Sequence, residues 1–204
     1  SCQVSTRDFW NEKYANTDYA YGTEPNEFLV SAVAKLKRCE TLSLAEGEGR
    51  NAVWLAQQGF TVSSIEQSEK GVAKTLRLAL QRGVIVMAER GELETFNIQP
   101  NSWDLMVSIY AHTPQELRRK LHRQVVAGLK PGGVFILEAY TPAQIPNNTG
   151  GPKDASLMPT AELLRSELHG LVFDHLEEIE RDVVEGSLHT GTAHVVQLVA
   201  HRAP

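Results

Sequence analysis

A glycine-rich turn carries the clearest chemical signal in this sequence. It reads Ala45-Glu46-Gly47-Glu48-Gly49 and lies between a predicted strand and a predicted helix. Glycine lets the backbone approach a ligand closely, and the helix that follows presents free amides with a partial positive charge. In open parallel sheets, ligands bind beyond the carboxyl ends of the strands, where this turn is expected. The turn alone fits a ligand site and a plain connection equally well.

Glu66 makes a nucleoside-binding site the better interpretation. It ends the second predicted strand, 17 residues after Gly49. An acidic side chain at this place can accept hydrogen bonds from both hydroxyl groups of a ribose. The competing interpretation is a solvated carboxylate at a strand end. The glycine turn and the acid together predict a nucleoside ligand, and they leave open which nucleoside it is.

Two further carboxylates bear on the identity of that nucleoside. The segment Gly47–Ala52 fits the dinucleotide-binding pattern, with Ala in the last place. However, Glu46 and Glu48 would stand beside the diphosphate, where like charges repel. A cofactor with a positive charge and no phosphate is accommodated better, which favours S-adenosylmethionine over NAD. An NAD-dependent oxidoreductase stays open as the alternative.

The elements around the turn alternate between strand and helix. We predict strands at 41–45, 60–66, 84–88, 103–110 and 134–140, with helices at 50–58, 68–82 and 114–129. The last helix is expected to open with a capping box at 113–116, and residues 130–133 are expected to form a turn. Strands and helices that alternate at this spacing imply right-handed crossovers and a parallel sheet.

The two ends of the chain complete the predicted fold. Helices at 6–14 and 26–38 precede the sheet, and a long loop at 141–159 precedes a helix at 160–169. Residues 171–184 and 192–201 form a hairpin, so the final strand should be antiparallel. We predict one α/β domain with a doubly wound, mostly parallel seven-stranded sheet and an antiparallel C-terminal hairpin strand. Residues 1–38 would form a helical lid, and residues 39–204 the sheet core.

Composition excludes several functional classes. Among 204 residues, 20 Lys and Arg stand against 25 Asp and Glu, a net charge of −5, which argues against binding nucleic acid through its phosphates. The two cysteines favour a reducing compartment. The histidines are scattered without the spacing of metal ligands, so we predict no metal site. No apolar run approaches the ~20 residues that span a bilayer, and a signal peptide is not expected. We therefore expect a cytoplasmic protein, a monomer or weak dimer, without membrane or nucleic-acid partners.

Several segments, in this order, carry a family resemblance: Phe9–Tyr14, Tyr21–Asn26, Gly47–Ala52, Leu129–Gly133 and Glu138–Pro142. Together they resemble the class I S-adenosylmethionine-dependent methyltransferases, in the small branch related to tellurite-resistance and thiopurine methyltransferases. The resemblance covers nearly the whole chain. It implies a Rossmann-like methyltransferase fold and methyl transfer from S-adenosylmethionine to a small-molecule acceptor. The branch suggests a soft nucleophile, such as a thiol or a metalloid, although no residue encodes which one.

The resemblance also implies which residues bind the cofactor. The implied residues are Trp10, Tyr14 and Tyr21 as an aromatic lid, Ala45, Glu46, Gly47, Gly49 and Asn51 at the glycine turn, Glu66, Gln67 and Ser68 at the ribose and adenine, Glu92 and Leu93 at the adenine edge, and Ser108 and Ile109 near the transferred methyl group. The chain departs from the family pattern at two positions. Ser43 replaces the usual Asp, and Ala45 replaces a Gly, so we expect weakened or altered binding. A non-catalytic binding module is therefore a further alternative.

Acceptor-side residues are harder to assign. His112, Tyr110 and Tyr140 follow or end strands at the binding edge and are the candidates. For His112 a surface histidine before a helix cap is the competing interpretation, because a single histidine has little specificity. The loop at 141–159 is expected to cover the acceptor site. The basic run 118–120 is expected on a solvated helix face, and the spacing of His189 and His194 is taken as coincidence.

Overall fold

A seven-stranded sheet with the order β3-β2-β1-β4-β5-β7-β6 forms the centre of the computed structural model, which describes residues 5–204. Its strands are β1 (Glu40–Leu44), β2 (Thr61–Glu66), β3 (Met87–Arg90), β4 (Trp103–Ile109), β5 (Leu129–Tyr140), β6 (Leu171–Glu185) and β7 (His189–Arg202). Strands β1 to β5 pair in parallel, and β7 is antiparallel to both β5 and β6. The predicted doubly wound sheet with an antiparallel hairpin strand is confirmed. Cys2 lies outside the described residues.

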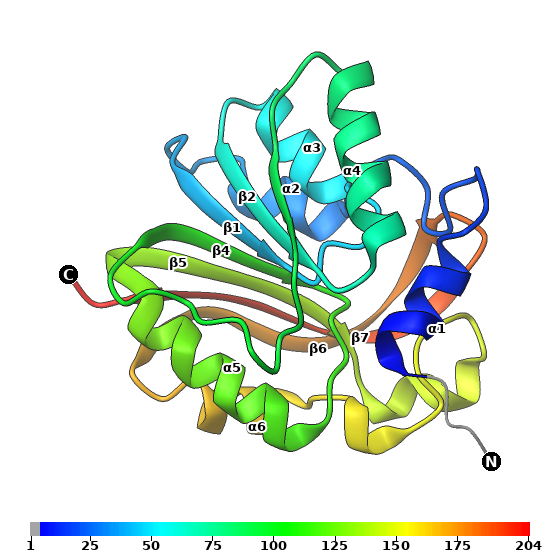
Figure 1. Cartoon of the computed structure of the whole chain (residues 1–204). Helices are drawn as coiled ribbons and strands as arrows, with labels where there is room; N and C mark the ends of the chain where they lie inside the picture. The colour runs from blue at the N-terminus through cyan, green and yellow to red at the C-terminus, as the bar shows by residue number, and fades with distance from the viewer. Residues whose placement is uncertain (1–4) are drawn as a thin grey trace.

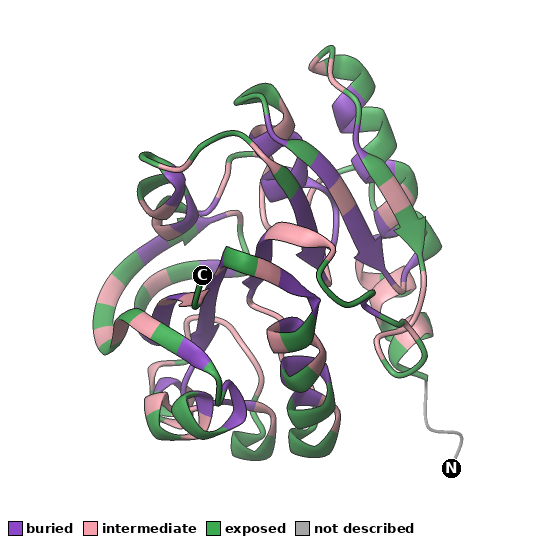
Figure 2. Cartoon of the chain, turned by 90° about the vertical axis from the view of Figure 1, so that its left-hand side faces the viewer, coloured by how far each residue is buried: buried purple, intermediate pink, exposed green. Residues whose placement is uncertain are grey.

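Helices cover both faces of this sheet (Figure 1). One face carries α2 (Glu27–Val33), α3 (Arg50–Gln57) and α4 (Glu69–Gln81), and the other carries α5 (Gln115–Gly128) and α6 (Ala161–Glu167). Each face has its own apolar core, and Figure 2 shows the central strands between them as mostly buried. The cores contain Leu29, Ala52, Val62 and Leu78 on the first face and Leu121, Val125, Phe135 and Leu164 on the second. Among the described helices, none is long and apolar enough to cross a membrane.

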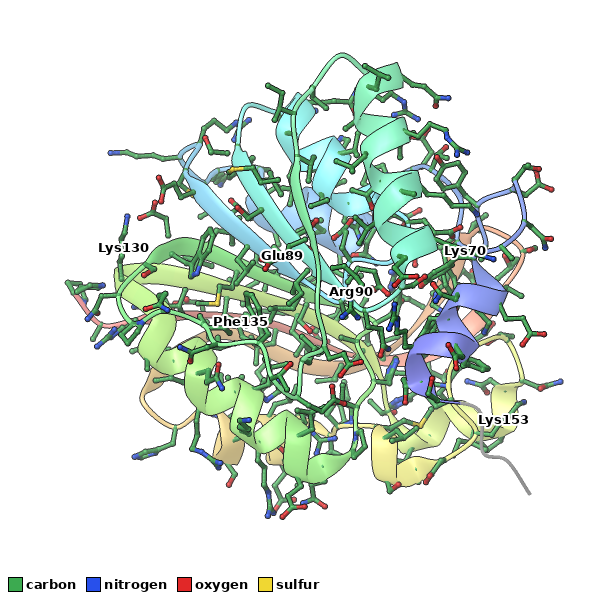
Figure 3. All side chains as sticks on the ribbon, in the orientation of Figure 1. Lys70, Glu89, Arg90, Lys130, Phe135 and Lys153 are labelled. Carbon is green, nitrogen blue, oxygen red and sulfur yellow. The ribbon has the colours of Figure 1, made fainter. Side chains whose placement is uncertain are left out.

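The carboxyl ends of the parallel strands meet at one edge of the sheet. Helix α1 (Thr6–Lys13), the loop after β5 and the β6–β7 hairpin gather at this edge (Figure 1). Figure 3 shows Lys153 of that loop near α1, and Lys130 at the opposite end of the sheet. The predicted loop contains two short 3₁₀ helices, η1 (Pro142–Asn147) and η2 (Ala155–Leu157). Thr149 fixes it to the hairpin, because its hydroxyl donates to the Thr192 carbonyl over 2.6 Å.

Two predicted element boundaries are wrong for the same local reason. Strand β3 begins at Met87 and not at residue 84, because the Val84 N–H donates to the Ala79 carbonyl and closes the end of α4. Helix α2 ends at Val33 and not at residue 38, because the Leu36 N–H turns back to the Val33 carbonyl. In both places the backbone forms a turn where side-chain periodicity alone predicted a regular element.

The predicted capping box at 113–116 is also wrong. Pro114 is the N-cap of α5 with an extended ψ of 148°, and no side chain caps the helix. The turn expected at 130–133 instead belongs to β5, whose first residue, Leu129, pairs with Trp103. The register shifts after that pair, and Gly132 has a φ of +82°. The Pro-Gly-Gly signal therefore marks an irregularity in a strand.

Candidate functional site

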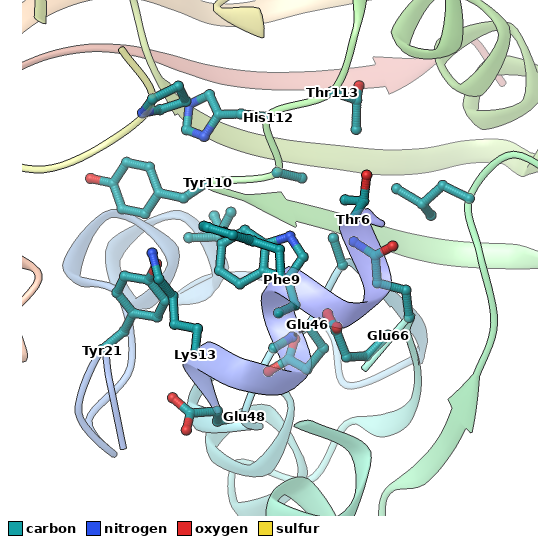
Figure 4. Close-up of a pocket in the computed structure, with 18 of the residues that line it drawn as sticks. Thr6, Phe9, Lys13, Tyr21, Glu46, Glu48, Glu66, Tyr110, His112 and Thr113 are labelled. Carbon is teal, nitrogen blue, oxygen red and sulfur yellow. Dashed lines mark hydrogen bonds between the residues drawn. The ribbon is translucent and has the colours of Figure 1, made fainter. Parts of the chain in front are cut away.

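A cavity of about 730 Å³ opens at the carboxyl edge of the sheet (Figure 4). Helix α1, the glycine turn, the ends of β2 and β4, the loop after β5 and the β6–β7 turn all contribute to its walls. This volume lies in the range of cavities that hold drug-sized ligands. The predicted site residues that line it are Trp10, Tyr14, Tyr21, Ala45, Glu46, Gly47, Asn51, Glu66, Gln67, Leu93, Ile109, Tyr110 and His112.

The other predicted residues, Gly49, Ser68, Glu92, Ser108 and Tyr140, do not line the cavity. Gly49 is needed for helix packing, since a Cβ there would lie 2.7 Å from the Thr75 Cα. Ser68 caps α4 and donates its hydroxyl to Asn11 Oδ1 over 2.6 Å.

The remaining three residues, Ser108, Tyr140 and Glu92, lie away from the cavity wall for different reasons. Ser108 is buried within the sheet, and Tyr140 is fully buried beneath the Tyr110 ring. Glu92 is half-buried, and its backbone carbonyl accepts from the Phe96 N–H. Its neighbours Leu93 and Glu94 line the cavity instead.

Glu46 organises the glycine turn from within. Its Oε1 accepts the N–H groups of Asn51 and Ala52, over 3.1 and 2.7 Å, in the first turn of α3. Its Oε2 accepts the Ser43 hydroxyl, so the residue that replaces the family Asp still takes part in the turn. First-turn amides are the groups that hold a phosphate at a helix N-terminus. Here a side chain of the protein already occupies them.

The charge of Glu48 is balanced by an ion pair, so the predicted repulsion of a ligand diphosphate by this residue does not occur. Its Oε2 forms a buried ion pair with Lys74 Nζ at 2.5 Å, and its Oε1 accepts the Ala20 N–H over 2.8 Å. The prediction that two unpaired carboxylates would repel a diphosphate is therefore wrong, because Glu48 is paired with Lys74 and Glu46 accepts backbone N–H groups. The structural argument against a diphosphate is the occupation of the α3 amides by Glu46.

Ala45 adopts a backbone conformation that favours glycine, with a φ of +50°. For an L-residue this costs about 1–2 kcal/mol, and the greater freedom of glycine in the unfolded chain offsets about 0.4–1 kcal/mol. We expect Ala45→Gly to raise the free energy of unfolding by about 0.5–1 kcal/mol in urea titrations. Ala52→Gly, inside helix α3, is the control and should lower it by at least about 1 kcal/mol. Equal losses in the two variants would contradict the assigned strain.

Glu66 faces the cavity with hydrogen-bonding capacity to spare. Its two oxygens accept the Gly47 and Ser68 N–H groups, over 3.0 and 2.8 Å. Each carboxylate oxygen has a second lone pair, so both can still accept from a ligand. Burial raises the pKa of Glu66 to about 7. The position therefore suits a ligand that donates two hydroxyl groups.

Aromatic side chains of α1 cover this part of the cavity. The rings of Trp10 and Tyr14 stack at 5.4 Å, and the Lys13 ammonium lies about 5 Å from the rings of Phe9 and Trp10. Asn11 and an ion pair between Arg7 and Glu69 attach the helix to the start of α4. These contacts place α1 over the glycine turn (Figure 4).

The opposite side of the cavity is lined by the rings of Tyr21, Tyr110 and His189, and the buried Tyr140 ring packs behind them. We call these four residues the aromatic end. The His189 ring lies 4.3 Å from Tyr21, 4.7 Å from Tyr110 and 5.1 Å from Tyr140, measured between centroids. Tyr110 and Tyr140 stack on each other at 4.7 Å. Figure 4 shows Tyr21 and Tyr110 across the pocket from Glu66.

His112 has a structural role that removes it as a candidate base. Its Nε2 accepts the backbone N–H of Tyr140 over 3.0 Å, which ties the chain after β4 to the end of β5. Burial lowers the pKa of His112 to about 3, so the ring is neutral at neutral pH. The competing prediction of a surface histidine is corrected as well, because the ring is stacked with Tyr140.

His189 is the titratable group that the sequence interpretation missed. It is buried, it lines the cavity, and its Nδ1 lies 3.8 Å from Glu185 Oε2. Burial lowers its pKa, so the imidazole is neutral at neutral pH. No local motif marks this residue, because only the hairpin brings the end of the chain back to the glycine turn.

A buried polar network lies behind the aromatic end. The fully buried Glu138 carboxylate accepts from Tyr110 Oη over 3.0 Å, from Asn26 Nδ2 over 2.8 Å and from Arg181 over 2.7 and 2.9 Å. Glu185 accepts from the same Asn26 amide and pairs with Arg50 at 3.0 Å. The network thus joins residues from five separate parts of the chain.

Of the basic run at 118–120, Arg119 and Lys120 lie on an exposed helix face as predicted, whereas Arg118 belongs to a second buried ion cluster. Arg118 is only 3% exposed and donates Nε and Nη2 to the Glu167 carboxylate over 2.9 Å each. His122 lies 2.9 Å from the same carboxylate. This cluster joins α5 to α6 on the far side of the sheet and takes no part in the cavity.

Sequence comparison gives two matches. A family model described as a methyltransferase domain matches residues 41–133. The probable S-adenosyl-L-methionine-dependent methyltransferase TehB of Haemophilus influenzae is 28% identical over 101 residues, which are 50% of this chain and 33% of that protein. The chain thus spans about one third of the length of the curated relative that it matches.

Solved structures extend the likeness to almost the whole fold. The crystal structure of TehB from Haemophilus influenzae has a TM-score of 0.73 and 18% identity, over 96% of this chain and 66% of that one. A structure from work on the conversion of a disulfide bond into a thioacetal group during echinomycin biosynthesis has a TM-score of 0.79 and 14% identity. The match covers 98% of this chain and 92% of that one. The fold is that of Rossmann-like methyltransferases. The two sequence matches are also with methyltransferases, in agreement with the resemblance found in the sequence.

Proposed function

We propose that this chain, a relative of the class I methyltransferases, transfers a methyl group from S-adenosylmethionine to a small-molecule acceptor. One observation carries the proposal. Glu66 offers two free lone pairs to a ribose beside a glycine turn whose helix amides are already occupied by Glu46. This combination fits a nucleoside and disfavours a diphosphate.

The residues at the cavity suit such a cofactor. Glu66 would accept the ribose hydroxyls, the glycine turn would lie along the methionyl part, and Trp10 and Tyr14 would cover it. When bound, the sulfonium of S-adenosylmethionine supplies an activated methyl group. The protein then has to align the acceptor with that methyl group and exclude water. Of the predicted lid at 1–38, α1 and Tyr21 line the cavity, whereas α2 packs into the core.

The aromatic end would hold the acceptor, which we propose to be a soft nucleophile such as a thiol. One structural relative comes from work on the conversion of a disulfide bond into a thioacetal group, which is sulfur chemistry. The acceptor sulfur forms a bond to the methyl carbon as the bond from that carbon to the sulfonium breaks. The thiol proton passes to His189, whose neutral ring accepts it while Glu185 stabilises the resulting charge from 3.8 Å.

The alternatives fit the site less well. An NAD-dependent oxidoreductase would need the α3 amides that Glu46 holds. Ser43 and Ala45 favour a binding module without turnover, but the Ser43 hydroxyl donates to Glu46, so this position still contributes a hydrogen bond within the turn. Transfer of a labelled methyl group from S-adenosylmethionine to a panel of small thiols and to tellurite tests the proposal. Transfer to at least one acceptor is expected, and none to any acceptor would refute turnover.

His189→Asn is expected to lower kcat by about 10²- to 10⁴-fold, the usual contribution of a general base. The affinity for S-adenosylhomocysteine should stay unchanged, because His189 contacts the acceptor side. The loss should shrink as the pH approaches the pKa of the acceptor thiol, since a thiolate needs no base. His175→Asn, at a half-exposed ring outside the cavity, is the control. A pH-independent loss, or weaker cofactor binding, would contradict the assigned role.

A further inference from the structure

We propose that Asn26 is a positioning residue, which sets the Glu185 carboxylate beside His189 and acts on the reaction through these two side chains. The inference rests on the proposed function, in which His189 is the base, and it adds a residue that does not line the cavity. Three features carry it: the hydrogen bonds that fix the Asn26 amide, the guanidinium groups beside Glu185, and the unpartnered nitrogen of the His189 ring.

The Asn26 amide is fixed on every side. It is fully buried, and its Nδ2 donates to Glu138 Oε1 over 2.8 Å and to Glu185 Oε1 over 2.7 Å. Its Oδ1 accepts the Leu29 N–H over 2.9 Å as the N-cap of α2, and its backbone N–H donates to Asn51 Oδ1 over 2.9 Å. A rotated amide would turn its oxygen toward two carboxylates, which would repel it. The cap therefore holds both amide donors in one place.

Without Asn26, the partners of the Glu185 carboxylate on this side would be cations. Arg50 Nη2 donates to Glu185 Oε2 over 3.0 Å, and Arg181 Nη2 lies 3.7 Å from Glu185 Oε1. The same Arg181 nitrogen donates to Glu138 over 2.7 Å. In a buried site, a guanidinium attracts a carboxylate more strongly than a neutral amide does. Asn26 occupies Oε1 and so keeps Glu185 from turning toward Arg181.

The place of the Glu185 carboxylate matters because of the His189 ring. The two residues are direct partners at the end of the β6–β7 hairpin, so the backbone brings their side chains together. His189 Nδ1 is buried, lies 3.8 Å from Glu185 Oε2 and has no hydrogen-bond partner within residues 5–204. A ring that accepts a proton at Nε2 carries a hydrogen on Nδ1, which then needs an acceptor. A carboxylate held at this place supplies one and stabilises the charged ring.

The other charges around His189 oppose its protonation. Burial lowers the pKa of His189, and the positive charges of Arg50 and Lys13 lower it further, whereas Glu185 raises it. The remaining titratable groups that face the ring are the neutral His112 and the phenols of Tyr21, Tyr110 and Tyr140. Glu185 is therefore the group through which a neighbour such as Asn26 can favour the charged ring.

Asn26→Ser separates this role from helix capping. Serine caps a helix about as well as asparagine does, and the backbone N–H to Asn51 is kept, but both Nδ2 donors are lost. The proton affinity of His189 is measured by NMR titration of histidine-labelled protein saturated with S-adenosylhomocysteine, with the signal assigned from His189→Asn. We expect this affinity to fall at least about threefold, because Glu185 turns away from the ring. The affinity for S-adenosylhomocysteine should stay unchanged.

Gln197→Met is the matched control. Gln197 is buried, and its Nε2 donates to Glu138 over 2.7 Å and not to Glu185. This variant removes a donor from the same polar network, so a general loosening of the network would lower the proton affinity of His189 in both variants. An unchanged affinity in Asn26→Ser, or an equal fall in Gln197→Met, would overturn the inference.

The wild-type protein gives a second reading that depends on no variant. The side-chain NH₂ signals of Asn26 should shift with the same midpoint as the His189 ring, because Glu185 accepts from the first and stabilises the second. A different midpoint, or no shift, would overturn the coupling. A wild-type protein that does not bind S-adenosylhomocysteine refutes the proposed function itself, so the two failures are distinguishable.

Discussion

Glu138→Ala is expected to lower the free energy of unfolding by about 3–5 kcal/mol, the range for breaking a buried ion pair. The Glu138 side chain is fully buried and accepts from Asn26, Tyr110, Arg181 and Gln197. Its removal leaves these donors without their acceptor, and the Arg181 guanidinium loses its closest counter-charge. Urea unfolding followed by circular dichroism measures the loss.

The chain offers a matched control for this variant. Glu27 also pairs with Arg181, at 3.7 Å, but its side chain is 75% exposed. Glu27→Ala should therefore cost no more than about 1 kcal/mol, as for exposed ion pairs. A similar small loss in Glu138→Ala would show that the network does not stabilise the fold. Strands β4, β5, β6 and β7 would then be held mainly by their apolar cores.

Glu66→Gln should weaken the binding of S-adenosylhomocysteine by at least about 100-fold. Each hydrogen bond to a charged group contributes about 1.5–3 kcal/mol, and two are expected between this carboxylate and the ribose. The neutral amide also has only one oxygen for the Gly47 and Ser68 N–H groups. Glu94→Gln, at an exposed carboxylate on the same cavity, is the control and should bind normally. Equal affinities of Glu66→Gln and wild type would remove Glu66 from the site.

The same carboxylate predicts a pH dependence. Burial raises the pKa of Glu66 to about 7, above its ordinary 4.5, so folding favours the protonated form. Its contribution to stability is therefore full below about pH 4.5 and declines as the pH rises toward about 7. Ribose hydroxyls donate to the ionised form, so affinity for S-adenosylhomocysteine should rise about tenfold between about pH 6 and about pH 8. Glu66→Gln should show no such rise.

The parallel part of the fold was predictable because its signals are local. Apolar runs that alternate with amphipathic helices specify β1 to β5, and Gly59 and Gly83 end their helices with a positive φ as expected. The glycine turn and Glu66 follow from the same pattern, since strand ends of a parallel sheet meet at one edge. The predicted element boundaries are wrong where the backbone closes a turn inside an apolar run, as at Val84.

The acceptor side was less predictable because long-range contacts create it. His189 reaches the cavity only through the pairing of β6 with β7, and Glu138 meets Asn26 across 112 positions of the sequence. His112 illustrates the reverse case, a well-placed histidine whose ring nitrogen is taken by the backbone. Glu46 was recognised as a carboxylate near the ligand, but its role as acceptor for the α3 amides depends on the turn geometry.

The central claim is that this cavity binds a nucleoside that carries no diphosphate. Isothermal titration of the protein with S-adenosylhomocysteine and, separately, with NADH tests it most directly. The account predicts saturable binding of S-adenosylhomocysteine at one site, lost in Glu66→Gln, and at least about 100-fold weaker binding of NADH, since Glu46 holds the amides that a diphosphate needs. Tighter binding of NADH, or no binding of S-adenosylhomocysteine at millimolar ligand, would contradict it.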